Sequence, residues 1–76
     1  MKEILENIIL NLVDNKEQVT INSREEERAT VFEVKVADSD MGKVIGKQGK
    51  IAKAIRTVMK SLAAKEHKKV IIEFVD

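Results

Sequence analysis

A chain of 76 residues with 14 Lys or Arg, 13 Asp or Glu and no cysteine is long enough for one domain and too short for two. The lack of cysteine excludes a disulfide framework, a thiolate zinc site and thiol catalysis. The net charge of +1 conceals a segregation: five basic against ten acidic residues in 1–41, nine against one in 42–69, and two acidic residues in 70–76. Such a basic centre attracts phosphate groups, while the acidic remainder repels them.

The first segment is expected to be an amphipathic helix that ends near Asp14-Asn15. Its apolar residues recur at helical spacing and are Ile4, Leu5, Ile8, Ile9, Leu12 and Val13. Charged and amide residues interrupt this run and no small-residue cleavage site follows it, so it does not resemble a targeting sequence. No run approaches the roughly 18 apolar residues of a membrane span, and a cytoplasmic protein with no membrane partner is expected.

Two runs of alternating apolar and polar residues come next and predict an antiparallel pair of strands. Val19 and Ile21 mark the first run, and Phe32, Val34 and Val36 mark the second. The charged residues 24–28 lie between the runs and are expected to form a solvated connection.

The second half predicts two helices and a strand. Asp38-Ser39-Asp40 offers three candidate N-caps for one short helical turn, which ends at Gly46. A four-turn helix is expected from Lys50 to about Ala64, and the β-branched run Val70–Val75 suits a buried strand. A right-handed crossover would place this strand parallel to the second. The predicted fold class is α+β, a two-layer sandwich of one domain (1–76), with three helices on one face of a three-stranded mixed sheet in the order α-β-β-α-α-β.

The loop between the short and the long helix, Gly46-Lys47-Gln48-Gly49, is the candidate binding site. Two glycines around two polar residues allow another backbone to approach closely, and the helix N-terminus that follows favours a phosphate. On a helical wheel a basic stripe continues from the loop, formed by Lys50, Lys53, Arg56 and Lys60. A solubilising face would mix charges of both signs, whereas nine of the ten charged residues in 42–69 are positive.

The segment Asp40–Arg56, with Ile45-Gly46-Lys47-Gln48-Gly49 at its centre, resembles the GxxG motif of KH domains. The element order is similar to the type II, bacterial arrangement, and the likeness to the small stand-alone KhpA (YlqC) family covers essentially the whole chain. In KH domains the GxxG loop clamps about four unpaired nucleotides. The resemblance implies binding of single-stranded RNA with low sequence specificity, and a post-transcriptional or RNA-chaperone role.

The resemblance also implies which residues contact RNA. The loop would hold the sugar-phosphate backbone, and apolar residues beside it would line a groove for the bases, although each of them also fits a plain core position. The groove residues would be Val44, Ile45, Ile51, Ala54, Ile55 and strand residues near Val34 and Val36. The expected RNA contacts are Lys43, Val44, Ile45, Gly46, Lys47, Gln48, Gly49, Lys50, Lys53, Arg56 and Lys60. With no Trp or Tyr and two Phe, the chain lacks the aromatic platforms of RRM and OB-fold proteins.

A protein-interaction module is the alternative function. The apolar arc of the long helix spans about 180° on the wheel, which is wider than the roughly 100° needed to face one core. The shoulder formed by Ala52, Met59 and Ala63 is therefore a candidate dimer interface, although alanine is equally compatible with exposure. The resemblance adds two partners: a second copy of the chain, and a larger KH-containing protein similar to KhpB.

Neither catalysis nor a metal site is predicted. The spacing from Gly42 to Lys47 is one residue short of a P-loop, and Gln48 stands where Ser or Thr should hold magnesium. His67 lies among charged residues in an expected exposed turn, and Glu25–Glu27 has no second acidic cluster to pair with. The protein is therefore expected not to be an enzyme, and to need no cofactor, metal or small-molecule substrate.

Overall fold

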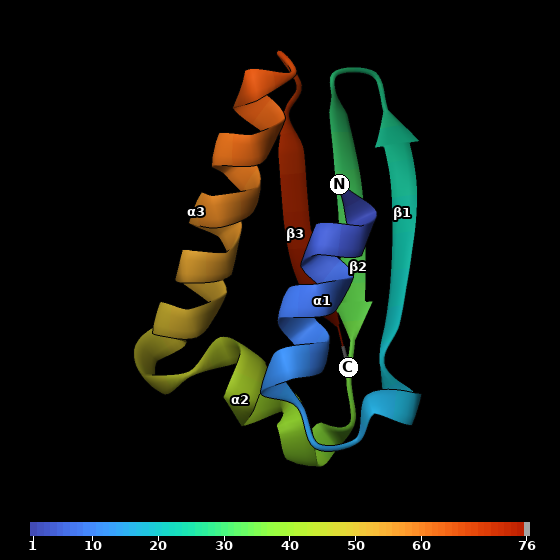
Figure 1. Ribbon diagram of the computed structural model, residues 1–76. Helices are drawn as coiled ribbons and strands as arrows, with labels where there is room; N and C mark the ends of the chain where they lie inside the picture. The colour runs from blue at the N-terminus through green and yellow to red at the C-terminus, as the bar shows by residue number, and fades with distance from the viewer. Residues whose placement is uncertain (76) are drawn as a thin grey trace.

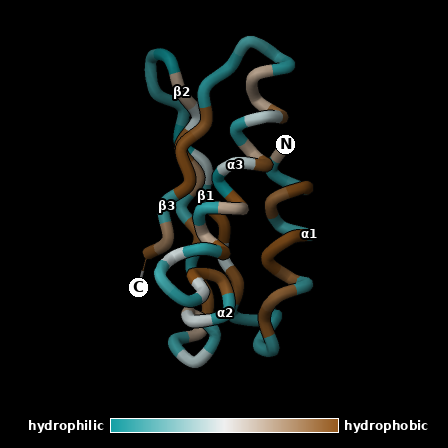
Figure 2. The backbone as a smooth tube through the Cα atoms, turned by 90° about the vertical axis from the view of Figure 1, so that its left-hand side faces the viewer, coloured by the Kyte–Doolittle hydropathy of each residue, from teal (hydrophilic) through white to brown (hydrophobic). Residues whose placement is uncertain are grey.

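The computed structural model describes residues 1–75 and has two layers, a three-stranded sheet with helices over one of its faces (Figure 1). The view turned by 90° separates the two layers (Figure 2). The predicted fold class and element order are confirmed. The helices and strands are α1 (Lys2–Leu12), β1 (Thr20–Glu26), β2 (Ala29–Lys35), α2 (Met41–Ile45), α3 (Lys50–Lys65) and β3 (Val70–Val75), with short 3-10 turns at Lys16–Gln18, Asp38–Asp40 and Lys47–Gly49.

The sheet has the strand order β1-β2-β3, so that β2 is central and β1 and β3 are its edges. β1 pairs with β2 in the antiparallel sense, and β2 pairs with β3 in the parallel sense. The parallel pairing is the one that the two intervening helices predicted. Among residues 1–75, one side of β3 consequently has no neighbouring strand, which leaves backbone groups there available to other partners.

The charged residues 24–28 differ from the solvated connection that was expected. β1 continues to Glu26, and only the next two residues form the turn. Ion pairs across the sheet account for the longer strand, because the Arg24 guanidinium lies 3.2 Å from Glu33 on β2 and 3.7 Å from Glu73 on β3. Val31 on β2 lies directly opposite Arg24 in the register. Its side chain points to the sheet face away from the helices, because it alternates with the helix-facing residues, yet it is only 2% exposed.

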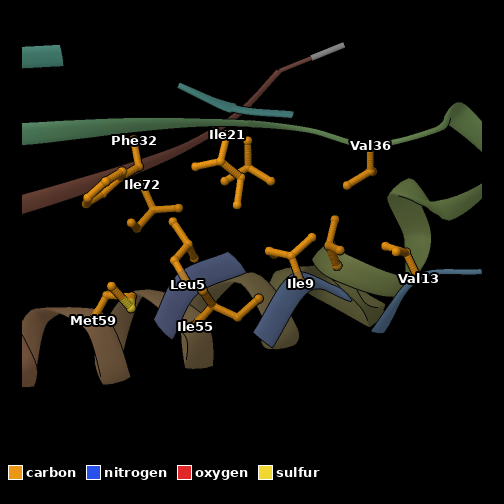
Figure 3. Close-up of a cluster of buried hydrophobic side chains, with 11 residues drawn as sticks. Leu5, Ile9, Val13, Ile21, Phe32, Val36, Ile55, Met59 and Ile72 are labelled. Atoms are coloured by element: carbon orange, nitrogen blue, oxygen red, sulfur yellow. The ribbon is translucent and has the colours of Figure 1, made fainter. Parts of the chain in front are cut away.

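The core lies between the sheet and the helices α1 and α3 (Figure 3). Leu5 and Ile9 of α1 and Met59 of α3 have no exposed surface. They pack against sheet residues such as Phe32 and Ile72. The residues of α3 that are buried form a single stripe at helical spacing: Ala52, Ile55, Met59 and Ala63.

Burial of this stripe gives α3 two exposed flanks with different chemistry. The flank beside the free edge of β3 carries Arg56, Lys60 and Ala64. The flank beside α1 carries apolar residues, among them Ala54 and Val58. The helix therefore separates a basic surface from an apolar one.

A buried carboxylate ties the end of α1 to the start of α2. Asp40 is 1% exposed and accepts hydrogen bonds from the backbone N–H of Asn15 at 2.9 Å, the Asn15 side-chain amide at 3.1 Å and the backbone N–H of Asp14 at 3.3 Å. No side chain caps α2, so Asp40 makes these long-range bonds in place of the cap that the sequence suggested. The Asn15 backbone bond is the main reason that the pKa of Asp40 lies below its usual value of 3.8.

Asp40→Asn is expected to lower the stability of the fold more than Asp38→Asn, which makes the same chemical change at an exposed neighbour. Because the pKa of Asp40 is lowered in the folded state, its stabilisation is present above about pH 4 and is lost as the pH falls through the folded value. Urea unfolding of both variants between pH 7 and pH 3 measures this difference, which should shrink at the acid end. Equal midpoints at pH 7 would contradict the role of Asp40.

Candidate nucleic-acid interface

The loop between α2 and α3 has a backbone conformation that requires glycine at its first position. Gly46 has φ 75° and ψ 177°, a region that is essentially restricted to glycine. A Cβ atom at Gly46 would lie 2.6 Å from Cγ1 of Ile51. Gln48 (φ 57°) and Gly49 (φ 72°) follow in the left-handed region, which completes the turn into α3.

The loop presents an uncapped helix end together with two exposed side chains. Lys47 and Gln48 are both exposed, and no side chain caps the N-terminus of α3 at Gly49. The Lys50 N–H donates a hydrogen bond to the Lys47 carbonyl. The next N–H groups in the first turn of α3 have no partner within the helix, and the positive end of the helix dipole lies beside them. The arrangement can receive an anion such as a phosphate.

The structure places the four basic residues predicted on α3, Lys50, Lys53, Arg56 and Lys60, at its exposed surface. Lys43 is different, because its ammonium group forms ion pairs with Asp14 and, at 3.4 Å, with Asp40. The hydrogen bond from Lys43 to Asp14 is the main cause that raises the pKa of Lys43. Its charge is thus compensated within the fold, whereas no such pair is found for the α3 residues within 1–75.

A groove of about 410 Å³ lies between the basic flank of α3 and the free edge of β3. Arg56 is fixed at this groove, since its Nε–H donates a hydrogen bond to the Ile72 carbonyl at 3.1 Å and its guanidinium lies 5.3 Å from the centre of the Phe74 ring. The groove residues are Arg56, Lys60, Ala64, Lys68, Lys69, Val70, Ile71 and Ile72.

The apolar groove implied by the resemblance does not match this one. Four of the residues expected in it have at most 4% exposure and belong to the core: Val34, Val36, Val44 and Ile55. Ile45 is half-buried against the core, and Ile51 and Ala54 face α1. Val44 in particular is corrected from an RNA contact to a core residue, because its side chain has no exposed surface.

Sequence reasoning missed the contribution of β3 and of the turn before it. Lys68 and Lys69 line the groove, followed by the first three residues of the strand. The sequence did contain an indication of this contribution. Two consecutive lysines directly precede a strand that the crossover topology places at a sheet edge. The basic surface therefore has two walls, one on α3 and one at the start of β3.

The shoulder of α3 expected at a dimer interface is also corrected. Ala52, Met59 and Ala63 are 3%, 0% and 1% exposed, because they face the sheet. Apart from Ala64 on the basic flank, the exposed apolar residues of α3 lie on the flank beside α1, namely Ala54 and Val58. A second groove of about 310 Å³ lies between α1 and α3 on this side. Its lining residues are Ile8 and Leu12 of α1 and Ile51, Ala54, Ile55 and Val58 of α3.

Within residues 1–75, no group of three or more His, Cys, Asp or Glu side chains could hold a metal ion. No helix in the same range is sufficiently long and apolar to cross a membrane. His67 lies exposed in the turn after α3, as predicted, with a φ of 58°.

Gly46→Ala is expected to destabilise the protein more than Gly49→Ala. At Gly49 an alanine must adopt the left-handed conformation, which costs about 1–2 kcal/mol, and at Gly46 it must enter a region that is essentially restricted to glycine. Only at Gly46 does the new methyl group also collide with Ile51, since nothing lies within 4 Å of a Cβ atom at Gly49. Urea denaturation compares the two variants, and an equal loss in both would contradict the importance of the Ile51 contact.

A family model described as the KH domain of KhpA/KhpB matches residues 2–74. The RNA-binding proteins KhpA of Clostridium perfringens and Clostridium acetobutylicum are 55% and 52% identical over 75 residues, which cover 99% of this chain and 100% of each relative. The crystal structure of APE1850 aligns with a TM-score of 0.64 and 32% identity over 95% of this chain and 48% of that one, so the chain spans about half of that solved protein. The chain belongs to the KhpA/KhpB family of KH domains.

Proposed function

We propose that the protein is a single, non-catalytic KH domain that binds single-stranded RNA through the Gly46–Gly49 loop and the basic flank of α3. One observation carries this proposal: the loop leads directly into the uncapped N-terminus of α3, and the exposed basic residues that follow along α3 reach a groove at the edge of β3, which Arg56 and Lys60 line. Relatives of 55% and 52% identity that are named RNA-binding proteins support it.

In the proposed complex the RNA backbone lies against the loop. Gly46 and Gly49 leave room for a close approach, and the free N–H groups of α3 and the Lys47 side chain neutralise phosphate charge. Lys50 and Lys53 continue the positive surface along the strand of RNA. The bases would then point into the groove, where Ala64 and Val70 offer apolar contacts.

The proposed mode of binding explains low sequence specificity. Contacts to phosphate position an RNA without identifying its bases. The acidic residues of the outer sheet face, such as Glu26, Glu33 and Glu73, lie on the side of the sheet away from the helices and disfavour binding there. A post-transcriptional or RNA-chaperone role in the cytoplasm fits a protein that accepts many RNAs.

The double variant Lys47→Asp/Gln48→Asp is expected to bind an unstructured, labelled RNA at least about tenfold more weakly, equivalent to 1.4 kcal/mol. Both side chains are exposed, and aspartate tolerates the left-handed conformation of residue 48, so the fold should persist. Lys16→Asp/Gln18→Asp is a matched control, with the same two substitutions in an exposed turn on the opposite side of the molecule (Figure 1). Fluorescence anisotropy measures both.

The salt dependence of the same titrations tests the electrostatic mechanism. For about three to five phosphate contacts, the slope of log K against log salt should be about −2 to −3.5 for the native protein. The loop variant should have a shallower slope, and the control should keep the native one. Native affinity that does not respond to salt, or equal weakening by both double variants, would contradict the proposed clamp.

A homodimer through the groove between α1 and α3 is the second part of the proposal. Ile4 and Val58 are large apolar residues with 43% and 47% exposure. Ile4 precedes Ile8 and Leu12 of the groove at four-residue spacing, so these residues share one face of α1. This strip is apolar, and pairing two RNA sites would raise avidity. A larger KH-containing partner, which the resemblance also implies, stays a prediction.

Val58→Asp is expected to raise the dimer dissociation constant at least about tenfold, because it places a charge in the proposed apolar contact. Thr57→Asp adds the same charge at the adjacent exposed position outside the groove and should leave association unchanged. Sedimentation velocity at tens of micromolar measures association. A purely monomeric native protein would rule out the dimer, and equal effects of the two variants would rule out this interface.

A further inference from the structure

Arg56 is held differently from the other basic residues of α3. Its Nε–H is bonded to the Ile72 carbonyl on the free edge of β3, and its guanidinium lies over the Phe74 ring. Both contacts come from the strand that forms one wall of the groove. A hydrogen bond and a cation–π contact together restrict a planar group in position and in tilt. Arg56 is therefore a fixed part of the groove wall, whereas a lysine on the same helix is a flexible point charge.

The guanidinium keeps donors that the fold does not use. Arginine has five N–H donors, and the contact with Ile72 uses the one on Nε. Arg24 illustrates the alternative, since its three nitrogens contact Glu26, Glu33 and Glu73. No carboxylate between residues 1 and 75 forms an ion pair with Arg56. Its two amino groups are consequently available to a ligand in the groove.

The geometry of these donors matches a base edge. A guanidinium presents parallel N–H groups that bind two neighbouring acceptors in a bidentate manner, as with O6 and N7 of guanine. Cytosine offers a similar pair in O2 and N3. On adenine, the amino donor lies beside each acceptor of its outer edges, and in uracil an N–H lies between the two carbonyl oxygens. These two bases cannot accept both bonds.

We propose that Arg56 is a specificity-determining residue of the groove between α3 and β3, and that it selects bases with two adjacent hydrogen-bond acceptors, guanine or cytosine, over adenine and uracil. The inference rests on the proposed binding of RNA along this groove. It adds selectivity at one nucleotide to a complex whose other contacts are mainly to phosphate.

The test uses labelled oligouridines of one length in which the central nucleotide is U, A, C or G. The native protein should bind the C or the G oligonucleotide about tenfold more tightly than the U and A oligonucleotides, since one bidentate pair discriminates by that order. The C and G arms identify which base supplies the acceptor pair. Arg56→Lys keeps the charge but loses the parallel N–H groups of the guanidinium, so it should reduce this preference to about twofold or less.

Lys53→Gln provides the contrasting variant, because a lost phosphate contact weakens all four oligonucleotides alike and makes the salt slope shallower by about 0.7. Native binding without preference, or a preference that survives in Arg56→Lys, would overturn the role of Arg56. Uniform weakening of all four RNAs by Arg56→Lys would also overturn it and would assign Arg56 to phosphate. Absence of native binding to every oligonucleotide would instead refute the proposed function itself.

Discussion

The backbone of Gly46 sets the direction in which α3 leaves the loop, because the required φ and ψ are accessible only to glycine and Ile51 occupies the space of a side chain. The direction of α3 decides which of its sides faces the sheet. With Met59 buried, the basic flank lies along β3 and the apolar flank lies along α1. The proposed RNA site and the proposed dimer interface therefore depend on the same turn.

Much of the fold followed from local patterns in the sequence. Helical spacing predicted α1 and α3 closely, and the two intervening helices predicted that β3 would run parallel to β2. The end of β1 could not be predicted in this way, because residues 24–26 are charged and look like part of a loop. Their strand conformation depends on Glu33 and Glu73, which are distant in sequence and meet Arg24 only in the folded sheet.

In the candidate site, too, local sequence patterns predicted some parts, whereas others depend on tertiary packing. The loop and the lysines of α3 are contiguous in sequence, so their proximity was predictable. A helical wheel gives the width of an apolar arc but not the part that faces the sheet, which is why Ala52 and Met59 were assigned to the wrong surface. The groove along β3 and the bonds of Asp40 to Asn15 are products of tertiary packing, and no local pattern indicates them.

The contact of Arg56 with the Ile72 carbonyl also affects the tendency of the protein to aggregate. A sheet edge with unpaired backbone groups is a template for strands of other chains, and proteins protect such edges with charge or cover them. At β1 the protection comes from charged residues such as Arg24 and Glu26. At β3, whose sequence is largely apolar, an arginine from a neighbouring helix bonds an edge carbonyl directly. In the absence of a ligand, Arg56 thus occupies a backbone acceptor of the strand most prone to intermolecular β-pairing and aggregation.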